Sequence, residues 1–412
     1  MANVSSSNGL EKRPKLRFPG FDEPWNTALL SDYFVKSTKK NSDGMISNVI
    51  CNSAKQGLIP QREYFDKDIA NSDNTNGYYI IESNDFVYNP RKSADAPYGP
   101  ISSYQYPEAG IVSPLYLCFR AKREINPLYF EWYFRSSTWH RYIYMSGDSG
   151  ARHDRVSIKD DVFFAMPINV PSAKEQERIS LFLDAIERRI ETQRTLVETL
   201  KKYKRGVISA LLSSKTNPYY SSETWKEVAL CDVASGFEYG MNAAATVYDG
   251  SHKYIRITDI DDNSHLYSQD VPVSPEGQVD EKYRVRENDI LFARTGASVG
   301  KSYRYRRSDG DLYYAGFLIR IHVNSDVNCG YVFQNTLTKA YRRWVLLESA
   351  RSGQPGINAE QYKQYRFLLP PLELQNKIST LATNLDNLIC KEGNLLSQIE
   401  QVKIALLQRL FI

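Results

Sequence analysis

The chain has 412 residues, 42% of them hydrophobic, and a formal net charge of +4 at pH 7. This length allows two or three domains with sizeable cores, and so small a positive charge does not by itself indicate a nucleic-acid partner. The sequence has no apolar run long enough to span a membrane, no signal peptide and no C-x-x-C pair among its five cysteines. We therefore expect a soluble, cytoplasmic protein with reduced thiols.

Residues 1–14 are polar, and we expect them to be a disordered tail. Residues 15–170 are predicted to form a first globular domain, because short β-like runs such as 77–83 and 85–90 alternate with clusters of Gly, Pro, Asn and Ser. The aromatic stretch 129–144 is predicted to be one helix packed on a sheet, and 162–171 a strand that leads into the next element.

Residues 171–214 are predicted to form one long helix. Polar Gln193 and Lys204 interrupt an otherwise apolar seam, and the run SSKTNP marks the end of the helix. Apolar residues recur with the 4-3 spacing of a coiled coil at Ile179, Leu183, Ile186, Ile190, Val197, Leu200, Val207 and Leu211.

The remainder of the chain repeats this plan. Residues 215–369 are predicted to form a second globular domain, with strands near 253–260, 288–295 and 365–372 and a helix over 330–349. Residues 370–412 are predicted to form a second long helix, whose seam, shifted by 199 residues, is interrupted by Glu392 and Lys403. Its apolar positions are Ile378, Ala382, Leu385, Ile389, Leu396, Ile399, Leu406 and Leu410.

These patterns predict an α+β fold with an internal pseudo-two-fold repeat. It consists of two mixed α/β domains joined by two long antiparallel helices that form a coiled coil. Within each domain the strands lack intervening helices, so the sheets cannot be built from parallel βαβ units. The aromatic content, with 29 tyrosines, fits tyrosine-rich cores better than an exceptional surface.

Two short motifs resemble catalytic ones without completing them. The run RTGASVGKS (294–302) resembles a phosphate-binding P-loop but has Thr295 where the first glycine is required, so it is predicted to be a turn that could meet DNA phosphate. The run NPYY from Asn217 resembles the N-P-P-Y tetrapeptide of amino-group DNA methyltransferases, but no glycine-rich methyl-donor loop accompanies it.

No other pattern predicts catalysis or metal binding. The five histidines have no ligand spacing, and the acidic run 259–262 is more typical of a solvated turn than of a metal centre. We therefore expect no catalytic residue, no metal site and no cofactor in this chain.

Basic, amide and aromatic residues in the loops are candidates for DNA contacts, because Arg and Lys suit phosphates and guanine, Gln and Asn suit adenine, and Tyr and Ser suit either. For any one of them a solvated surface role is favoured, but their grouping on matching loops of two repeated domains gives them weight. In the first domain they are Lys55, Gln56, Arg62, Arg91, Tyr98, Ser102, Tyr104, Arg152 and His153. In the second they are Arg256, Arg294, Thr295, Ser298, Lys301, Arg304, Ser352, Gln354 and Asn358.

Several segments together resemble the specificity subunit of type I restriction–modification enzymes. They are the head LRFPGFDEPW (16–25), YIRITDI with NDILFARTGASVGKS, the loop SGQPGIN, FLLPPLELQNKI (367–378) and, in the first copy, MPINVPSAKEQERI with LKKYKRGVISALLSSK. The resemblance implies two target recognition domains that read the halves of a split, asymmetric duplex site, with the long helices as a spacer between them. It also implies two methyltransferase subunits and restriction/translocase subunits as partners, which would hold S-adenosylmethionine, ATP and Mg.

Two other interpretations remain open at this level. One is a self-contained DNA methyltransferase or nuclease with built-in recognition, which would require a methyl-donor fold or metal carboxylates. The other is a coiled-coil adaptor with no DNA role, against which the basic loops of both domains argue.

Overall fold

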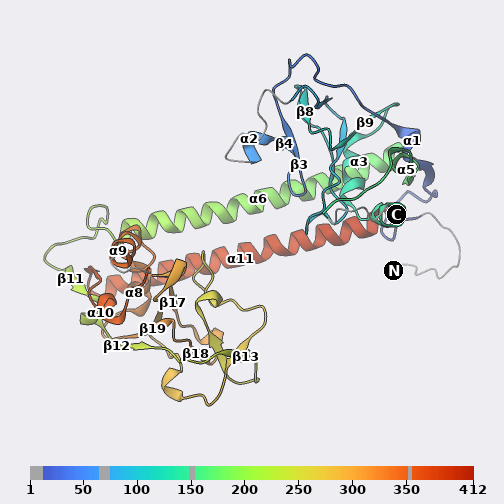
Figure 1. Cartoon of the computed structure of the whole chain (residues 1–412). Coiled ribbons are helices and arrows are strands. Elements are labelled where there is room, and N and C mark those ends of the chain that lie inside the picture. The colour runs from blue at the N-terminus through green and yellow to red at the C-terminus, as the bar shows by residue number, and fades with distance from the viewer. Residues whose placement is uncertain (1–12, 65–74, 148–153, 351–354) are drawn as a thin grey trace. The chain divides into compact units, whose positions relative to one another are not determined.

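The computed structural model describes residues 13–64, 75–147, 154–350 and 355–412 (Figure 1). The chain divides into two compact units, one of residues 1–194 with 394–412 and the other of residues 195–393. We call them unit 1 and unit 2. Each unit holds one globular domain together with a segment of each long helix. The predicted tail, apart from its last two residues, lies outside the described residues.

Unit 1 is built around a four-stranded antiparallel sheet of order β2-β9-β6-β7. The same domain has two further two-stranded antiparallel sheets, β3-β4 and β5-β8. The strands are β2 (Phe34–Lys36), β3 (Ile50–Ser53), β4 (Gly57–Pro60), β5 (Tyr79–Ile81), β6 (Phe86–Tyr88), β7 (Ile101–Ser103), β8 (Gly110–Val112) and β9 (Leu117–Ala121). The helices are α2 (Gln61–Tyr64), α3 (Pro127–Arg135), α4 (His140–Ser146) and α5 (Asp160–Phe164).

Unit 2 repeats this sheet as β12-β19-β16-β17, again antiparallel, which confirms the internal repeat. Its ribbons are β13-β15, antiparallel, and β14-β18, a parallel pair that the sequence did not predict. The strands are β12 (Ala234–Tyr239), β13 (Ala245–Val247), β14 (Lys253–Ile255), β15 (Val273–Pro275), β16 (Asp289–Ala293), β17 (Ser302–Arg304), β18 (Leu312–Tyr314) and β19 (Leu318–Val323). The helices are α8 (Cys329–Asn335), α9 (Lys339–Ser349) and α10 (Ala359–Lys363).

A short antiparallel ladder closes each domain at its two ends. In unit 1 it joins β1 (Asn26–Leu29) to β10 (Pro167–Val170), and in unit 2 it joins β11 (Lys226–Ala229) to β20 (Arg366–Leu369). One helical turn follows each first strand, α1 (Leu30–Tyr33) and α7 (Leu230–Val233). The backbone N–H that opens this turn donates across the ladder in both units, from Leu30 to Met166 and from Leu230 to Tyr365, at 2.8 Å each.

The aromatic stretches predicted as single helices are each two helices, so that part of the prediction was wrong. The break falls at Ser136 in unit 1 and near Thr336 in unit 2, where hydroxyls bond to backbone carbonyls of the preceding turn. Such side chains compete with the helical hydrogen bonds and favour a new start, and Thr338 caps α9 through the N–H of Tyr341. The predicted strand 162–171 is likewise the end of α5 followed by β10.

Both long helices form as predicted, α6 (Ala173–Leu211) and α11 (Leu372–Leu410). Every predicted apolar seam position is buried or half-buried. In unit 1 the helix segments run antiparallel, because Glu187 pairs with Lys403 at 2.7 Å while Arg194, later in α6, pairs with the earlier Glu400 at 2.7 Å. In unit 2 Lys204 of α6 pairs with Asp386 of α11 at 2.5 Å. No helix in the described part of the chain is long and apolar enough to cross a membrane.

Each domain core includes residues of both long helices. In unit 1 Ile179 and Leu183 of α6 and Leu410 of α11 pack with the aromatic residues of α3, and the ring of Phe411 lies 5.7 Å from that of Tyr129. In unit 2 Ile208 of α6, Leu212 just after it, and Ile378 and Ala382 of α11 pack in the domain core. Among the described residues twelve tyrosines are at most 4% exposed, which agrees with tyrosine-rich cores: Tyr88, Tyr104, Tyr129, Tyr133, Tyr254, Tyr303, Tyr313, Tyr314, Tyr331, Tyr341, Tyr362 and Tyr365.

Candidate nucleic-acid interface

Two candidate loops of unit 2, distant in sequence, lie side by side. Thr295 forms an antiparallel β-bridge with Gly356. The carbonyl of Arg294 accepts from the N–H of Ile357 at 2.9 Å, and the N–H of Gly296 donates to Pro355 at 3.2 Å. The structure therefore brings the turn after β16 together with the loop before α10. Because the turn continues into strand β17 rather than into a helix, it does not have the architecture of a P-loop.

Arg294 is the central cation of this surface. Its guanidinium carbon lies 4.8 Å from the ring centre of Tyr239 and 6.0 Å from that of Phe317. Its Nε is buried and has no hydrogen-bond partner in the described chain. The two rings are 41% and 60% exposed, respectively. Such a cation held by aromatic faces suits a phosphate or a base edge.

Sequence reasoning missed Tyr239 and Phe317. They stand at the end of β12 and just before β19, and nothing in their local pattern distinguishes them from other exposed aromatic residues. Only the sheet order, in which β19 lies between β12 and β16, brings both strand ends near the turn after β16.

Other candidate residues of unit 2 are engaged within the chain. Lys301 forms an ion pair with Asp262 and donates to the carbonyl of Ile260 at 3.0 Å. Arg256 binds the carboxylate of Asp259 through two bonds of 2.9 Å, and this hydrogen bonding raises the pKa of Arg256. These ion pairs stabilise the turn at 256–262, so the acidic run there serves the fold.

Three further candidates of unit 2 have mixed roles. Arg304 lies over the ring of Phe333, 5.8 Å from its centre. Asn358 caps α10 by accepting from the N–H of Gln361 at 2.9 Å. Ser298 is half-buried in the turn itself. Ser352 and Gln354 lie outside the described residues.

Unit 1 repeats the pairing of the two loops. Arg91 forms an antiparallel bridge with Arg155. The carbonyl of Pro90 accepts from Val156 at 2.9 Å, and the N–H of Lys92 donates to Asp154 at 2.8 Å. Strand register places Pro90 at the position of Arg294. We call each pair of bridged loops, 90–92 with 154–156 and 294–296 with 355–357, the loop frame of its domain. The two loop frames share their backbone hydrogen bonds but carry different side chains. Arg155 was also missed from sequence.

Both frames turn at a glycine in the left-handed region. Gly99 and Gly300 each have φ +82° and precede β7 and β17 by the same distance. Gly99 is therefore the structural equivalent of Gly300. A side chain at either position would be strained, because L residues avoid this region.

Four unit 1 candidates lie on accessible loops or helices. Lys55 in the β3-β4 turn pairs with Asp95 in the loop after β6, at 3.4 Å, and Gln56 is exposed beside it. Arg91 is exposed in the frame itself, and Arg62 is exposed on α2. The Lys55–Asp95 ion pair brings the β3-β4 turn, with Lys55 and Gln56, against the loop that follows Arg91.

The remaining unit 1 candidates are less accessible. Tyr98 is half-buried against His140, with ring centres 4.9 Å apart. Ser102 is 5% exposed and donates to Asn52 at 2.9 Å, while Tyr104 is fully buried. Ser102 and Tyr104 are therefore not accessible for a DNA contact. Arg152 and His153 lie outside the described residues.

The other candidate motifs have structural roles. Asn217, of the NPYY run, donates from Nδ2 to Leu211 at 2.5 Å and accepts from the N–H of Tyr219 at 2.7 Å, so it closes the C-terminus of α6. Among the described residues no three His, Cys, Asp or Glu side chains are grouped as a metal site would require.

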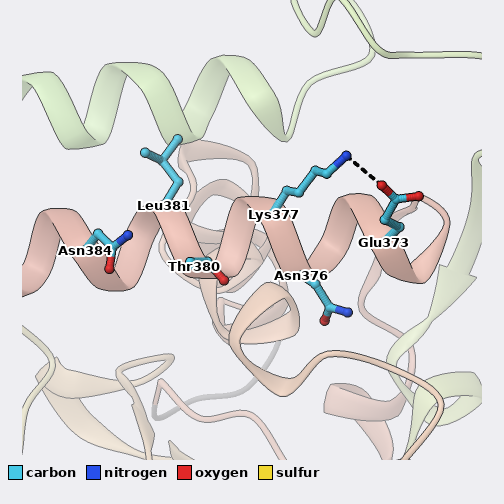
Figure 2. Close-up of a pocket in the computed structure, with 6 residues that line it drawn as sticks. All are labelled: Glu373, Asn376, Lys377, Thr380, Leu381 and Asn384. Atoms are coloured by element: carbon cyan, nitrogen blue, oxygen red, sulfur yellow. Dashed lines mark ion pairs between the residues drawn. The ribbon is translucent and has the colours of Figure 1, made fainter.

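A shallow hollow lies along the first turns of α11 (Figure 2). Glu373 and Lys377 pair across one helical turn there at 2.6 Å, as Figure 2 shows. An open hollow on one helix does not enclose a small molecule. Its lining residues are Glu373, Asn376, Lys377, Thr380, Leu381 and Asn384.

Comparison with known proteins finds relatives of this geometry. Residues 222–401 match the model of the type I restriction modification DNA specificity domain. The chain is also similar to the type I restriction enzyme StySPI specificity subunit of Salmonella potsdam, with 23% identity over 309 residues, which are 71% of this chain and 66% of that protein. A putative MjaX specificity subunit of Methanocaldococcus jannaschii is 24% identical over 46% of each chain. The chain thus aligns with less than two thirds of each relative's length.

Solved structures of specificity subunits share the fold. The S subunit from M. genitalium superposes with a TM-score of 0.56 at 13% identity, covering 97% of this chain and 99% of that one. A chain from a structure of type I R-M complex assembly and conformational transition gives a TM-score of 0.57 at 15% identity, covering 96% and 99%. The resemblance and the fold class predicted from sequence are confirmed.

Proposed function

We propose that this chain is a specificity subunit that recognises a split, asymmetric duplex DNA site, each globular domain reading one half. The observation that carries the proposal is the repeated loop frame, which joins Arg294 to Ile357 in unit 2 and Pro90 to Val156 in unit 1. One frame with different side chains is what two readers of different half-sites require. The match of residues 222–401 to the specificity-domain model supports the same role.

In unit 2 the proposed contact surface centres on Arg294, with Thr295, Ser298 and the loop that includes Ser352, Gln354 and Asn358. Lys301, Arg256 and Arg304 support it, and they contact phosphate only where DNA displaces their present partners. In unit 1 the surface comprises Lys55, Gln56, Arg91 and Tyr98, with Arg62, Arg152 and His153 at its borders. A positive surface of this kind predicts duplex binding that weakens steeply with salt.

The chain is proposed to direct chemistry that its partners perform. Those partners are two methyltransferase subunits, which hold S-adenosylmethionine, and restriction/translocase subunits, which use ATP and Mg. Such a complex works on DNA in the cytoplasm. The position of Asn217 supports a non-catalytic subunit. Asn217 belongs to the one methyltransferase-like motif of the sequence, and its side chain is bonded to the backbone at the end of α6.

The long helices are proposed to set the spacing between the half-sites. Each has 39 residues, about 58 Å at 1.5 Å per residue, and half-sites about one DNA turn (roughly 34 Å) apart fit such a separator. Removal of a matched heptad from both helices should shorten the spacer of the target while both half-sites stay intact. An unchanged spacer would contradict this role.

The decisive experiment is methylome sequencing of a host that expresses the methyltransferase subunit with and without this chain. A new bipartite motif, methylated only when the chain is present, is the expected result. Methylation that does not depend on the chain would overturn the proposal. Methyl transfer by the purified chain alone would instead favour a self-contained enzyme.

A further inference from the structure

The outer surfaces of α4 and α9 share an unusual feature. In α4, Tyr144 and Met145 are 73% and 71% exposed, and in α9, Leu346 and Leu347 are 70% and 62% exposed. Single exposed apolar residues are common on protein surfaces. Two adjacent large ones on a short surface helix, present in both domains, need an explanation.

The two pairs occupy equivalent positions. Asn126 and Asn328, 202 residues apart, both cap the helix before the pair by accepting from the N–H three residues later. The shift of 202 residues also superposes buried Ile143 on buried Val345, and then Tyr144 falls on Leu346 and Met145 on Leu347. The exposed pair therefore belongs to the repeated unit rather than to one domain.

A cation accompanies each pair. Arg141 and Arg343 are also equivalent under the shift, and both are exposed. Neither has an ion-pair or hydrogen-bond partner within the ranges that the structure describes. Each lies on the same helix face as its apolar pair, three and four residues before it. We call these sets strip 1 (Arg141, Tyr144, Met145) and strip 2 (Arg343, Leu346, Leu347).

The repetition indicates what the strips face. Surfaces that read bases must differ between two domains that read different half-sites, as the frame does at Pro90 and Arg294. A surface that stays the same faces something that is the same at both domains. The phosphate backbone is one such object, but phosphates are bound by cationic and polar groups rather than by pairs of large apolar side chains. A protein bound in two copies fits both the apolar pair and the single arginine.

We propose that strips 1 and 2 are docking sites for two copies of one partner protein, which presents to each strip an apolar hollow bordered by carboxylates. This inference rests on the proposed function, in which that partner is the methyltransferase subunit. It assigns the partner a contact on each globular domain, on the helix that precedes the loop of the DNA frame. One partner copy would thereby touch the same helix-and-loop segment that contacts the half-site.

The test counts partner copies on the full-length chain. Native mass spectrometry of the chain co-expressed with its methyltransferase subunit should give two copies for the wild type. The double variant Leu346→Ser with Leu347→Ser should retain one copy, and Tyr144→Ser with Met145→Ser should also retain one. Affinity for the lost copy should fall at least about tenfold, as for other paired apolar anchors. Arg343→Glu should weaken the same copy in a salt-dependent manner.

Matched controls separate docking from general surface effects. Val247 and Val271 are 85% and 76% exposed in unit 2 and belong to neither strip, so Val247→Ser with Val271→Ser should retain two copies. Thermal unfolding of each variant should match that of the wild type, because the replaced side chains are exposed.

Three outcomes would overturn the inference. The strip variants could hold two copies at unchanged affinity. They could instead lose duplex affinity with both copies in place, which would make the strips DNA contacts. They could abolish a self-association of the isolated chain, which would assign the strips to a second copy of this chain. A wild type that binds no methyltransferase subunit would refute the proposed function itself, a result distinct from all three.

Discussion

Lys204 of α6 and Asp386 of α11 form an ion pair with Nζ and Oδ1 2.5 Å apart, and the repeat provides this pair twice. A shift of 199 residues converts Lys204 into Lys403 and Glu187 into Asp386, and Lys403 pairs with Glu187 at 2.7 Å. The two seam lysines thus each meet an acid of the other helix, and the two ion pairs occupy equivalent positions of the repeat.

We predict that this pair favours one register of the helices. Lys204→Asp should lower the free energy of unfolding by about 1 kcal/mol, because it sets two carboxylates together at a site where the lysine is 16% exposed. The swap Lys204→Asp with Asp386→Lys should restore most of this loss. Urea unfolding followed by tryptophan fluorescence measures both. Swapping the exposed pair Glu373 and Lys377 is the control and should change little; an equal effect there would contradict the prediction.

Arg294 should determine one half of the recognised site only. Arg294→Ala should relax or change one half of the methylated motif, because it removes the cation held over Tyr239, and the other half should stay as it is. Methylome sequencing measures this directly. Arg307→Ala is a suitable control, because Arg307 is exposed beyond the opposite end of β16 and paired with Glu287. Loss of both halves in Arg294→Ala would contradict two independent readers.

Arg91→Ala should give the reciprocal result. Arg91 occupies in unit 1 the position that Thr295 occupies in unit 2. Its replacement should therefore alter the half-site that Arg294→Ala leaves unchanged. The same sequencing experiment measures it. If both variants altered the same half-site, the assignment of one half to each domain would be wrong.

Alanine substitutions at three glycines of the paired loops should lower the free energy of unfolding by different amounts. Gly296 has φ +72° with open space where a Cβ would lie, so Gly296→Ala should cost only the backbone strain, about 1 kcal/mol. At Gly300 a Cβ would lie 2.6 Å from Val345, and at Gly99 2.1 Å from the carbonyl oxygen of Asn89. Alanine at these two positions should cost about 3 kcal/mol or more. Urea unfolding measures all three, and equal losses would contradict the steric explanation.

His265 should contribute a pH dependence to stability. Burial, with help from the nearby cations Lys301, Arg342 and Lys204, lowers its pKa, so the folded chain keeps the ring neutral where the unfolded chain protonates it. The free energy of unfolding should therefore fall as the pH drops below the unfolded pKa of about 6.5, by at most about 1.4 kcal/mol per pH unit.

His265→Asn tests this dependence. Asparagine tolerates the backbone φ of +56° at this position and does not titrate. The difference in unfolding free energy between variant and wild type should vary between pH 7.5 and pH 5. A difference that stays constant over that range would show that His265 does not titrate as described.

The sequence predicted the parts of the fold that are periodic. The heptad seams are long and regular, so both helices and their pairing could be predicted. The breaks at Ser136 and Thr336 could not, because an aromatic helix pattern continues across them while local hydroxyl bonds decide the outcome. The parallel pair β14-β18 also depends on non-local pairing, which no local pattern encodes.

The candidate site was predicted in part for the same reason. Arg294 stands in a recognisable turn, whereas Tyr239 and Phe317 reach it only through the order of strands in the sheet. Conversely, Ser102 and Tyr104 resemble contact residues in their composition, but Ser102 bonds to buried Asn52 and Tyr104 fills the core of unit 1. Composition alone does not separate a polar surface from a satisfied polar interior.

The ladders that close the two domains have a consequence for how such a chain can change over time. β1 pairs with β10 and β11 with β20 over four residue pairs each, so both ends of a domain leave it side by side and in the same geometry. Recombination at these points would exchange a whole domain as a cassette without altering the helix that follows. A whole domain could then be replaced in a single genetic event, while both long helices keep their sequence.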